Sequence, residues 1–295
     1  MKTKLLIVCV VAIWILTDAG CKSSPSPYPD GNFHVMVISD VHISRDESKD
    51  QRLQTLIADI NAKKYPQLSA LIVTGDCVSK VYSGAHIESN NNLAKLMTLL
   101  DPLAVPYFLI MGNHDYKIDS NKDSDAPFSR QEIDTMEVVW KKYTGFDPYY
   151  STTYNGWKFI MLNSMRGRYL KRAFDPVQID WLEQELASGR PVLLFFHHPI
   201  ETDHFHFWGK FKDLITEETE ARFFKLCLDY QDTIKGIFVG HGHSWIEGTL
   251  FDRIPVFETD SFGESDDLPF YIIGIDTLKK IINVSQAPIS VAEVK

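Results

Sequence analysis

The sequence has little cysteine, no excess of positive charge and few long apolar runs. It holds four cysteines in 295 residues, and only Cys77 and Cys227 lie beyond residue 21. That is too few for a disulfide scaffold, so we expect two separate buried thiols, with one bridge in an oxidising compartment as the alternative. A formal net charge of −9 argues against a broad basic face for nucleic acid. A serine nucleophile elbow and a glycine-rich phosphate loop are also lacking.

The longest apolar run lies at the start of the chain. Leu5 to Leu16 follows Lys2 and Lys4, which is typical of a secretory signal peptide and too short to span a bilayer. The next residues, Asp18-Ala19-Gly20-Cys21, resemble the lipobox of bacterial lipoproteins, although Asp18 stands where an aliphatic residue is usual. The resemblance implies that Cys21 is lipidated and becomes the mature N-terminus.

Serine and proline alternate in residues 22–29, a composition typical of a semi-extended tether. We therefore expect a signal peptide at 1–20 and a lipidated Cys21 with its tether at 21–31. The protein would then be exported and held by lipid in a bacterial cell envelope, on its periplasmic or outer side. A plain secretory signal with an incidental cysteine is the alternative.

The remaining chain, residues 32–295, reads as one domain of the α/β class, with neither an internal repeat nor a second linker. Apolar strands alternate with amphipathic helices. We expect strands at 33–39, 70–74, 107–111, 192–196 and 234–239, and helices at 50–63, 86–100, 128–143, 176–186 and 217–229. Asn155-Gly156 predicts a hairpin turn between strands 149–153 and 157–162. Short strands are expected at 246–251, 255–258, 270–275 and 278–284.

Polar residues follow five of these strands, at the end where open α/β sheets place their sites. The segments are Asp40-Val41-His42, Gly75-Asp76, Gly112-Asn113-His114-Asp115, His197-His198-Pro199 and Gly240-His241-Gly242-His243. Each alone is a common turn or a core histidine. Together they offer oxygen and nitrogen ligands without thiolate, which suits Fe, Mn or Zn. Seven ligands exceed the need of one ion, and a shared carboxylate would divide them between two.

This ordered set resembles the calcineurin-like metallophosphoesterase superfamily, from Phe33 to about Val284. The resemblance implies two packed mixed β-sheets flanked by helices, a four-layer αββα sandwich. Spacing alone would also allow a doubly wound sheet. The resemblance further implies that one metal ion is held by Asp40, His42 and His243, that Asp76 bridges, and that Asn113, His197 and His241 complete the second site. His197 is preferred to His198 because family members place the ligand two residues before the proline.

The same resemblance implies catalytic roles for the residues after Asn113. His114 would act as electrostatic partner or as acid for the leaving group, and Asp115 would orient it through a hydrogen bond. Candidate substrate contacts are Arg166 and the aromatic stretch 203–211 with His204 and His206. Solvated surface arginine and a loop folded over the sheet edge are the respective alternatives.

We therefore predict a metal-dependent phosphoesterase that hydrolyses phosphomono- or phosphodiesters with a hydroxide held between two divalent or trivalent metal ions. Its substrate would be a phosphorylated small molecule or a headgroup. The alternative is a surface lipoprotein that binds a metal or ligand without turnover. A two-metal nuclease is disfavoured by the acidic charge.

Overall fold

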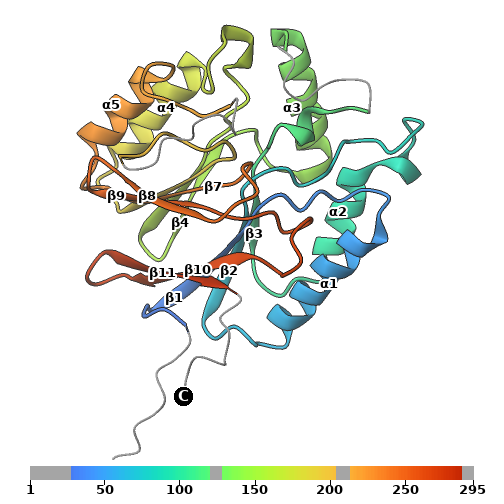
Figure 1. Cartoon of the computed structure of the whole chain (residues 1–295), viewed down its shortest axis with the longest axis horizontal. Coiled ribbons are helices and arrows are strands. Elements are labelled where there is room, and N and C mark those ends of the chain that lie inside the picture. Colours follow the sequence, from blue (N-terminus) through green and yellow to red (C-terminus); the bar gives the residue numbers. More distant parts are fainter. Residues whose placement is uncertain (1–27, 120–127, 204–212, 288–295) are drawn as a thin grey trace, which may run out of the picture.

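The structure is a computed structural model, and it describes residues 28–119, 128–203 and 213–287. Two mixed β-sheets pack face to face, with helices on both outer faces (Figure 1). In the first sheet β1, β2 and β3 are parallel, and β10 and β11 continue it in antiparallel pairs. Its order is β11 (Ile281–Ala287), β10 (Phe270–Asp276), β1 (Phe33–Ile38), β2 (Leu68–Val73) and β3 (Tyr107–Leu109).

The second sheet has a parallel centre and one antiparallel strand at each edge. Its order is β4 (Tyr150–Tyr154), β5 (Trp157–Met161), β6 (Val192–Phe195), β7 (Ile234–Val239), β9 (Ile254–Glu258) and β8 (Ile246–Leu250). The β4–β5 hairpin turns at Asn155-Gly156, both with positive φ, as the Asn-Gly pair predicts.

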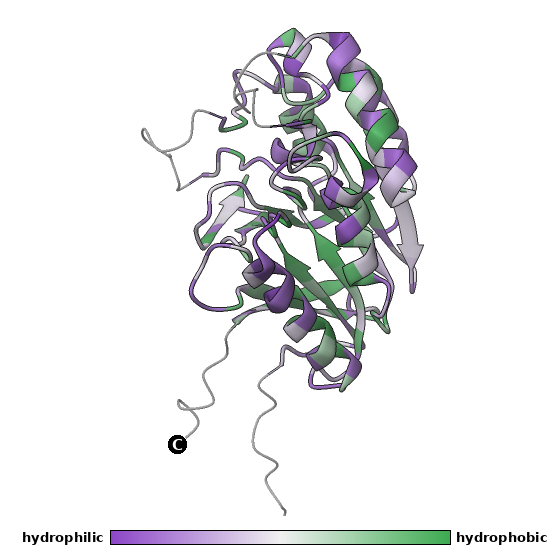
Figure 2. Ribbon diagram, turned by 90° about the vertical axis from the view of Figure 1, so that its right-hand side faces the viewer, coloured by the Kyte–Doolittle hydropathy of each residue, from purple (hydrophilic) through white to green (hydrophobic). Residues whose placement is uncertain are grey.

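Helices cover the outer face of each sheet and complete four layers. The first sheet carries α1 (Glu47–Asn61), α2 (Asn92–Leu100) and α3 (Arg130–Thr144), and the second carries α4 (Pro176–Leu186) and α5 (Ala221–Asp229). Figure 2 shows the strands as the apolar centre and the polar helix faces outside. The predicted αββα sandwich is confirmed.

Apolar residues on both faces of the central strands create three hydrophobic cores. In β6, Val192 and Leu194 face the helices while Leu193 and Phe195 face the first sheet. This alternation follows from the period of two in a strand, and strands buried on both faces are almost wholly apolar. Cys77 and Cys227 lie in different cores as free buried thiols, so the expectation of two separate thiols is confirmed.

Several local predictions differ from the structure. The helix expected at 217–229 begins at Ala221, and the strand expected at 278–284 lies instead at Ile281–Ala287. The helix expected at 86–100 begins only at Asn92, because Asn91 caps it by accepting from the Ala94 amide and a short 3₁₀ turn, Glu88–Asn90, precedes it. The end of the expected tether, residues 28–31, is folded onto the domain: the Tyr28 hydroxyl donates to the Lys64 carbonyl at 2.6 Å.

The predicted signal peptide and Cys21 lie outside the described residues. Within the described ranges, each helix is too short or too polar to cross a membrane.

Candidate metal centre

Five strands of the two sheets deliver their polar ends to one place. Asp40 follows β1, Asp76 follows β2 and Asn113 follows β3, while His197 follows β6 and His241 follows β7. The carboxyl ends of parallel strands share one edge of a sheet. Because the sheets are packed together, their two edges meet, and side chains more than 200 positions apart come into contact: His243 Nε2 lies 3.1 Å from Asp40 Oδ1.

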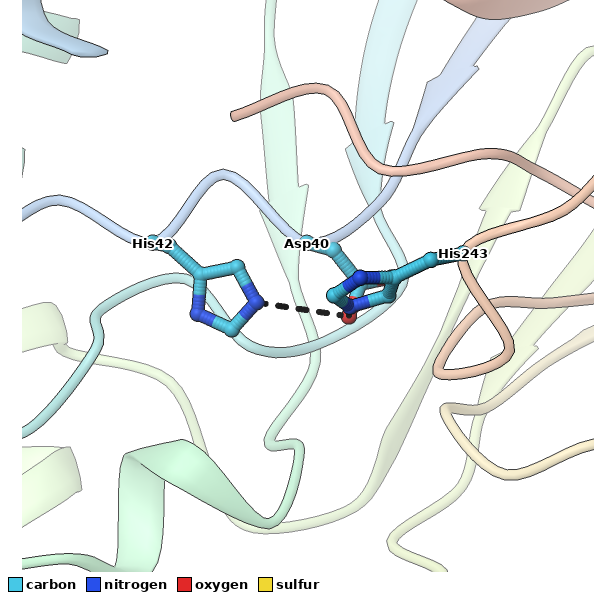
Figure 3. Close-up of side chains that lie close together, drawn as sticks. All are labelled: Asp40, His42 and His243. Atoms are coloured by element: carbon cyan, nitrogen blue, oxygen red, sulfur yellow. Dashed lines mark hydrogen bonds and ion pairs between the residues drawn. The ribbon is translucent and has the colours of Figure 1, made fainter. Parts of the chain in front are cut away.

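Asp40, His42 and His243 form what we call the first half-site. Both imidazoles approach the Asp40 carboxylate from different sides (Figure 3). The His42 Nε2 atom lies 3.7 Å from Asp40 Oδ1 and is buried without a hydrogen-bond partner. His243 is the open side of this group, with 36% of its side chain exposed.

Asp76 stands between this group and a second one. Its Oδ2 atom lies 3.8 Å from His42 Nε2, and its Oδ1 atom lies 3.3 Å from His197 Nε2. The two oxygens of one carboxylate therefore face two different groups of ligands, which is the placement that a bridging carboxylate needs.

Asn113, His197 and His241 form the second half-site. The Asn113 Oδ1 atom lies 3.0 Å from both His197 Nε2 and His241 Nδ1. The other ring nitrogen of His197 lies 2.9 Å from the Thr74 carbonyl, to which it donates. In a neutral His197, Nε2 is then a lone pair facing another acceptor, an arrangement that requires a proton or a cation between them.

The backbone is strained where it carries these side chains. Five of the seven predicted ligands have positive φ, namely Asp40, His42, Asp76, His241 and His243. Each such residue costs of the order of 1 kcal/mol, and such strain gathers at functional sites. Gly112 permits the close approach of two loops: a Cβ there would lie 2.3 Å from both the amide nitrogen and Oδ1 of Asp76.

The carboxylates remain charged despite full burial. Burial opposes the charge of Asp40, but the hydrogen bond from His243 and the nearby His197 lower the pKa of Asp40 to about 2. Burial also raises the pKa of Asp76, but the nearby His197 imidazole outweighs burial and holds this pKa far below its usual range. Burial alone would lower the pKa of His197, but Asp76 and Asp40 raise it to about 9.

These observations fit a pair of cations. Two buried carboxylates, an amide oxygen and four imidazoles converge, and buried charges of one sign need a counter-charge. Without metal, the counter-charge is a proton on His197, whose pKa is raised for that reason. Oxygen and imidazole ligands without thiolate suit Fe, Mn or Zn, and groups of Asp and His here could hold metal ions.

His114 lies beside the centre and faces it with one nitrogen. Its Nδ1 atom donates to the Ser79 carbonyl at 3.0 Å, which leaves Nε2 free to face Asp76 Oδ2 at 3.9 Å. The Nζ atom of Lys117 lies 3.3 Å from the same Nε2. A proton or a positive charge can therefore be presented at this nitrogen.

The predicted role of Asp115 requires correction. Its carboxylate does not orient His114, because it accepts three backbone amides instead, from Gly112 at 2.8 Å, Cys77 at 3.2 Å and Val78 at 3.0 Å. Asp115 thus ties the loop after β3 to the loop after β2. The orienting acceptor of His114 is the carbonyl of Ser79.

The predicted role of Arg166 as a substrate contact is also wrong. Its guanidinium is buried and donates to Glu137 at 2.5 Å and to Asp175 at 2.9 and 3.0 Å, so its charge is already neutralised within the fold. Stacking over Tyr149 fixes it further. His204 and His206, the other predicted contacts, lie outside the described residues.

Sequence reasoning missed Asp213 and the carbonyl groups of Thr74 and Ser79. Asp213 Oδ2 lies 3.8 Å from His241 Nε2, on the side of the ring away from Asn113, and Arg168 donates to Asp213 Oδ1 at 2.6 Å. A carboxylate behind a ligand histidine commonly fixes its orientation. No local sequence signal pointed to Asp213.

Comparisons with known proteins agree with this architecture. Residues 33–245 match the model of the calcineurin-like phosphoesterase family. Two relatives named probable cyclic nucleotide phosphodiesterases are each 24% identical. The one from Psychrobacter arcticus aligns over 58% of this chain and 61% of its own length. The one from Vesicomyosocius okutanii aligns over 76% of this chain and 83% of its own.

Solved structures share the fold. A dimetal phosphatase from Danio rerio has a TM-score of 0.60 at 15% identity, covering 83% of this chain and 93% of that one. An anchor protein in the inner membrane complex of Plasmodium has a TM-score of 0.52 at 10% identity, covering 89% and 86%. Since the family model covers most of the chain, the protein belongs to the calcineurin-like phosphoesterase family.

Proposed function

We propose that the protein is a metal-dependent phosphoesterase, with phosphodiesters such as cyclic nucleotides as the first substrate class to test. The observation that carries the proposal is the position of Asp76 between the two half-sites. The names of the two relatives support the cyclic nucleotide class, and the chain spans 61% of the length of the first. Phosphomonoesters remain within the proposal.

The residues of the two half-sites would hold two cations, of Fe, Mn or Zn. When bound, such cations activate water as a nucleophile and neutralise the charge on phosphoryl oxygens. A hydrogen bond to Thr74 orients His197, and the Asp213 carboxylate lies 3.8 Å from the far nitrogen of His241, so the other nitrogen of each ring faces the centre. His114 presents Nε2 to the leaving oxygen, and a proton held there can pass to the departing alkoxide. Lys117 adds positive charge beside it.

We also propose that lipid on Cys21 holds this domain at the membrane of a bacterial cell envelope. The sequence around Cys21 and the serine- and proline-rich residues after it support the proposal. A Cys21→Ser variant would be released from the membrane fraction into the soluble fraction, and retention of that variant in membranes would contradict it.

The test of the enzyme uses metal-loaded protein on bis(4-nitrophenyl) phosphate, 4-nitrophenyl phosphate and 3′,5′-cyclic AMP. Asp76→Ala should lose both turnover and bound metal, measured by elemental analysis. Asp232→Ala is the matched control, because this aspartate is highly exposed and pairs only with Arg253 among the described contacts. Turnover retained by Asp76→Ala would contradict the mechanism. Metal-loaded wild-type protein inert on the whole panel would support the non-catalytic binding alternative.

A further inference from the structure

The turn between β10 and β11 carries an exposed apolar and basic tip. We call Leu278, Lys279, Lys280 and Ile281 the hairpin tip. Leu278 is 88% exposed, the highest value among large hydrophobic residues of the described chain, and Ile281 is 44% exposed. One exposed aliphatic residue is ordinary, but here two of them flank two lysines.

Positive charge accompanies the apolar residues at this tip. Lys279 Nζ lies 3.1 Å from Asp276 Oδ2 while remaining 73% exposed, and Lys280 has no ion pair among the described contacts. Asp30 is exposed nearby. In a chain with net charge −9, adjacent lysines between exposed aliphatics are a distinctive combination. It suits an anionic lipid surface, where aliphatics enter the interface and ammonium groups meet phosphates.

The N-terminal chain leaves the domain beside the hairpin tip. Asn32 Oδ1 accepts from the Thr277 amide at 2.8 Å, and Asn283 Nδ2 donates to the Asp30 carbonyl at 2.9 Å. The start of β1 and this hairpin lie together at the left of Figure 1. Cys21 precedes Tyr28 by seven positions, which a proline-rich chain spans in about 22 Å. Lipid on Cys21 would therefore keep the tip close to the bilayer.

We propose that the hairpin tip contacts an anionic lipid bilayer and orients the protein on it. The contact rests on the proposed lipid anchor, because two aliphatic residues and two lysines alone bind a membrane weakly and reversibly. The anchor supplies proximity, and the hairpin tip selects which side of the domain faces the lipid.

This orientation restricts the substrate. β1 runs from Phe33, paired with Ile275 beside the tip, to Ile38, two residues before Asp40. Six strand residues span about 20 Å, so the metal centre lies at the far end of the domain from the bilayer. Substrates then arrive from solution, and the phospholipid headgroups of the same membrane stay out of reach.

The test uses full-length protein from cell membranes, reconstituted in vesicles of phosphatidylglycerol and phosphatidylethanolamine. A cysteine is introduced as Leu278→Cys or, as matched control, as Ile87→Cys. Ile87 is 56% exposed and lies in the loop after β2, at the end of the domain that carries the metal centre. The two native domain thiols are buried, so a membrane-impermeant maleimide reports only the new site. The labelling rate is compared in vesicles and in detergent.

We expect labelling at position 278 to slow in anionic vesicles and labelling at position 87 to stay unchanged. Lys279→Gln and Lys280→Gln should each weaken the protection about five-fold, the effect of one lysine near an anionic surface. Equal rates at 278 in vesicles and detergent, with the chain still floating with vesicles, would overturn the contact alone. Protection at position 87 instead of position 278 would show that the domain faces the bilayer with its opposite end and would contradict the proposed orientation. A wild-type chain that does not float would overturn the anchor and the contact together.

The phosphoesterase proposal is measured in the same samples by turnover of bis(4-nitrophenyl) phosphate. Protection at position 278 without turnover would support the membrane contact and contradict the phosphoesterase proposal. Turnover without protection at position 278 would support the phosphoesterase proposal and contradict the membrane contact.

Discussion

The two half-sites share the Asp76 carboxylate but differ in how deeply their side chains are buried. In the second, His197 is fully buried, and Asn113 is nearly so. In the first, His243 leaves more than a third of its side chain in solvent. The far nitrogen of each histidine has a partner, the Thr74 carbonyl for His197 and Glu264 at 3.2 Å for His243. A fully buried ligand nevertheless keeps its orientation before metal arrives, whereas a partly exposed one loses more rotamer freedom on binding. The second half-site should therefore bind its ion more tightly and exchange it more slowly.

The largest effect should come from removing what the half-sites share. Asp76→Asn keeps the shape but removes the central charge, so both ions should be lost together. Turnover should fall about a thousand-fold, corresponding to about 4 kcal/mol of lost charge stabilisation. Titration with metal would check this by isothermal calorimetry. Loss of one ion only would show that Asp76 serves a single half-site.

The next effect should separate the half-sites. His243→Ala should weaken the first half-site, and excess metal should restore turnover because the remaining ligands keep their geometry. His197→Ala should weaken the second half-site by at least about 100-fold, beyond what loss of an outer partner costs, and excess metal should not restore it. Activity measured against metal concentration distinguishes the two. Equal rescue of both variants would contradict the comparison.

A smaller effect is expected from Asp213→Asn. This change keeps the size of the side chain but weakens the hold on the His241 ring, so the second half-site should lose between about 10- and 100-fold in affinity. The first half-site should bind as before. Calorimetry with two resolved binding events measures both, and an equal loss at both half-sites would indicate a general structural defect instead.

The smallest effect concerns pH. His197, with its pKa raised to about 9 by Asp76 and Asp40 against burial, stabilises metal-free protein fully below pH 6.5 and loses this contribution toward pH 9. Burial and the Asp40 charge raise the pKa of Glu258 to about 9 as well. Its contribution to stability is therefore also lost as the pH rises toward 9. Metal-free protein should therefore be less stable at pH 9 than at pH 6.5. The metal-loaded form should lack the His197 part of this slope, since metal replaces the proton on His197, and should keep the Glu258 part. Thermal unfolding of both forms checks it.

Much of the fold was predictable because the signals are local. The helix at 176–186 is bounded as expected, since Asp175 caps it and Pro176 occupies its first turn. Polar residues after apolar strands indicated the metal centre. The pairing of β10 with β1 and the partners of Arg166 depend on residues far away in sequence, which no local pattern reveals. Asp213 escaped notice for the same reason: its approach to His241 exists only once the chain is folded.

Ligands drawn from both sheets set the moment at which the protein can acquire its ions. Asp40, Asp76 and Asn113 are synthesised early, but each half-site needs a histidine from the Gly240–His243 segment. A growing chain that has formed only the first three strands therefore holds carboxylates without their imidazole partners. Capture of the proposed pair of cations would accordingly be a late event in biogenesis, and their binding would show that both sheets have docked.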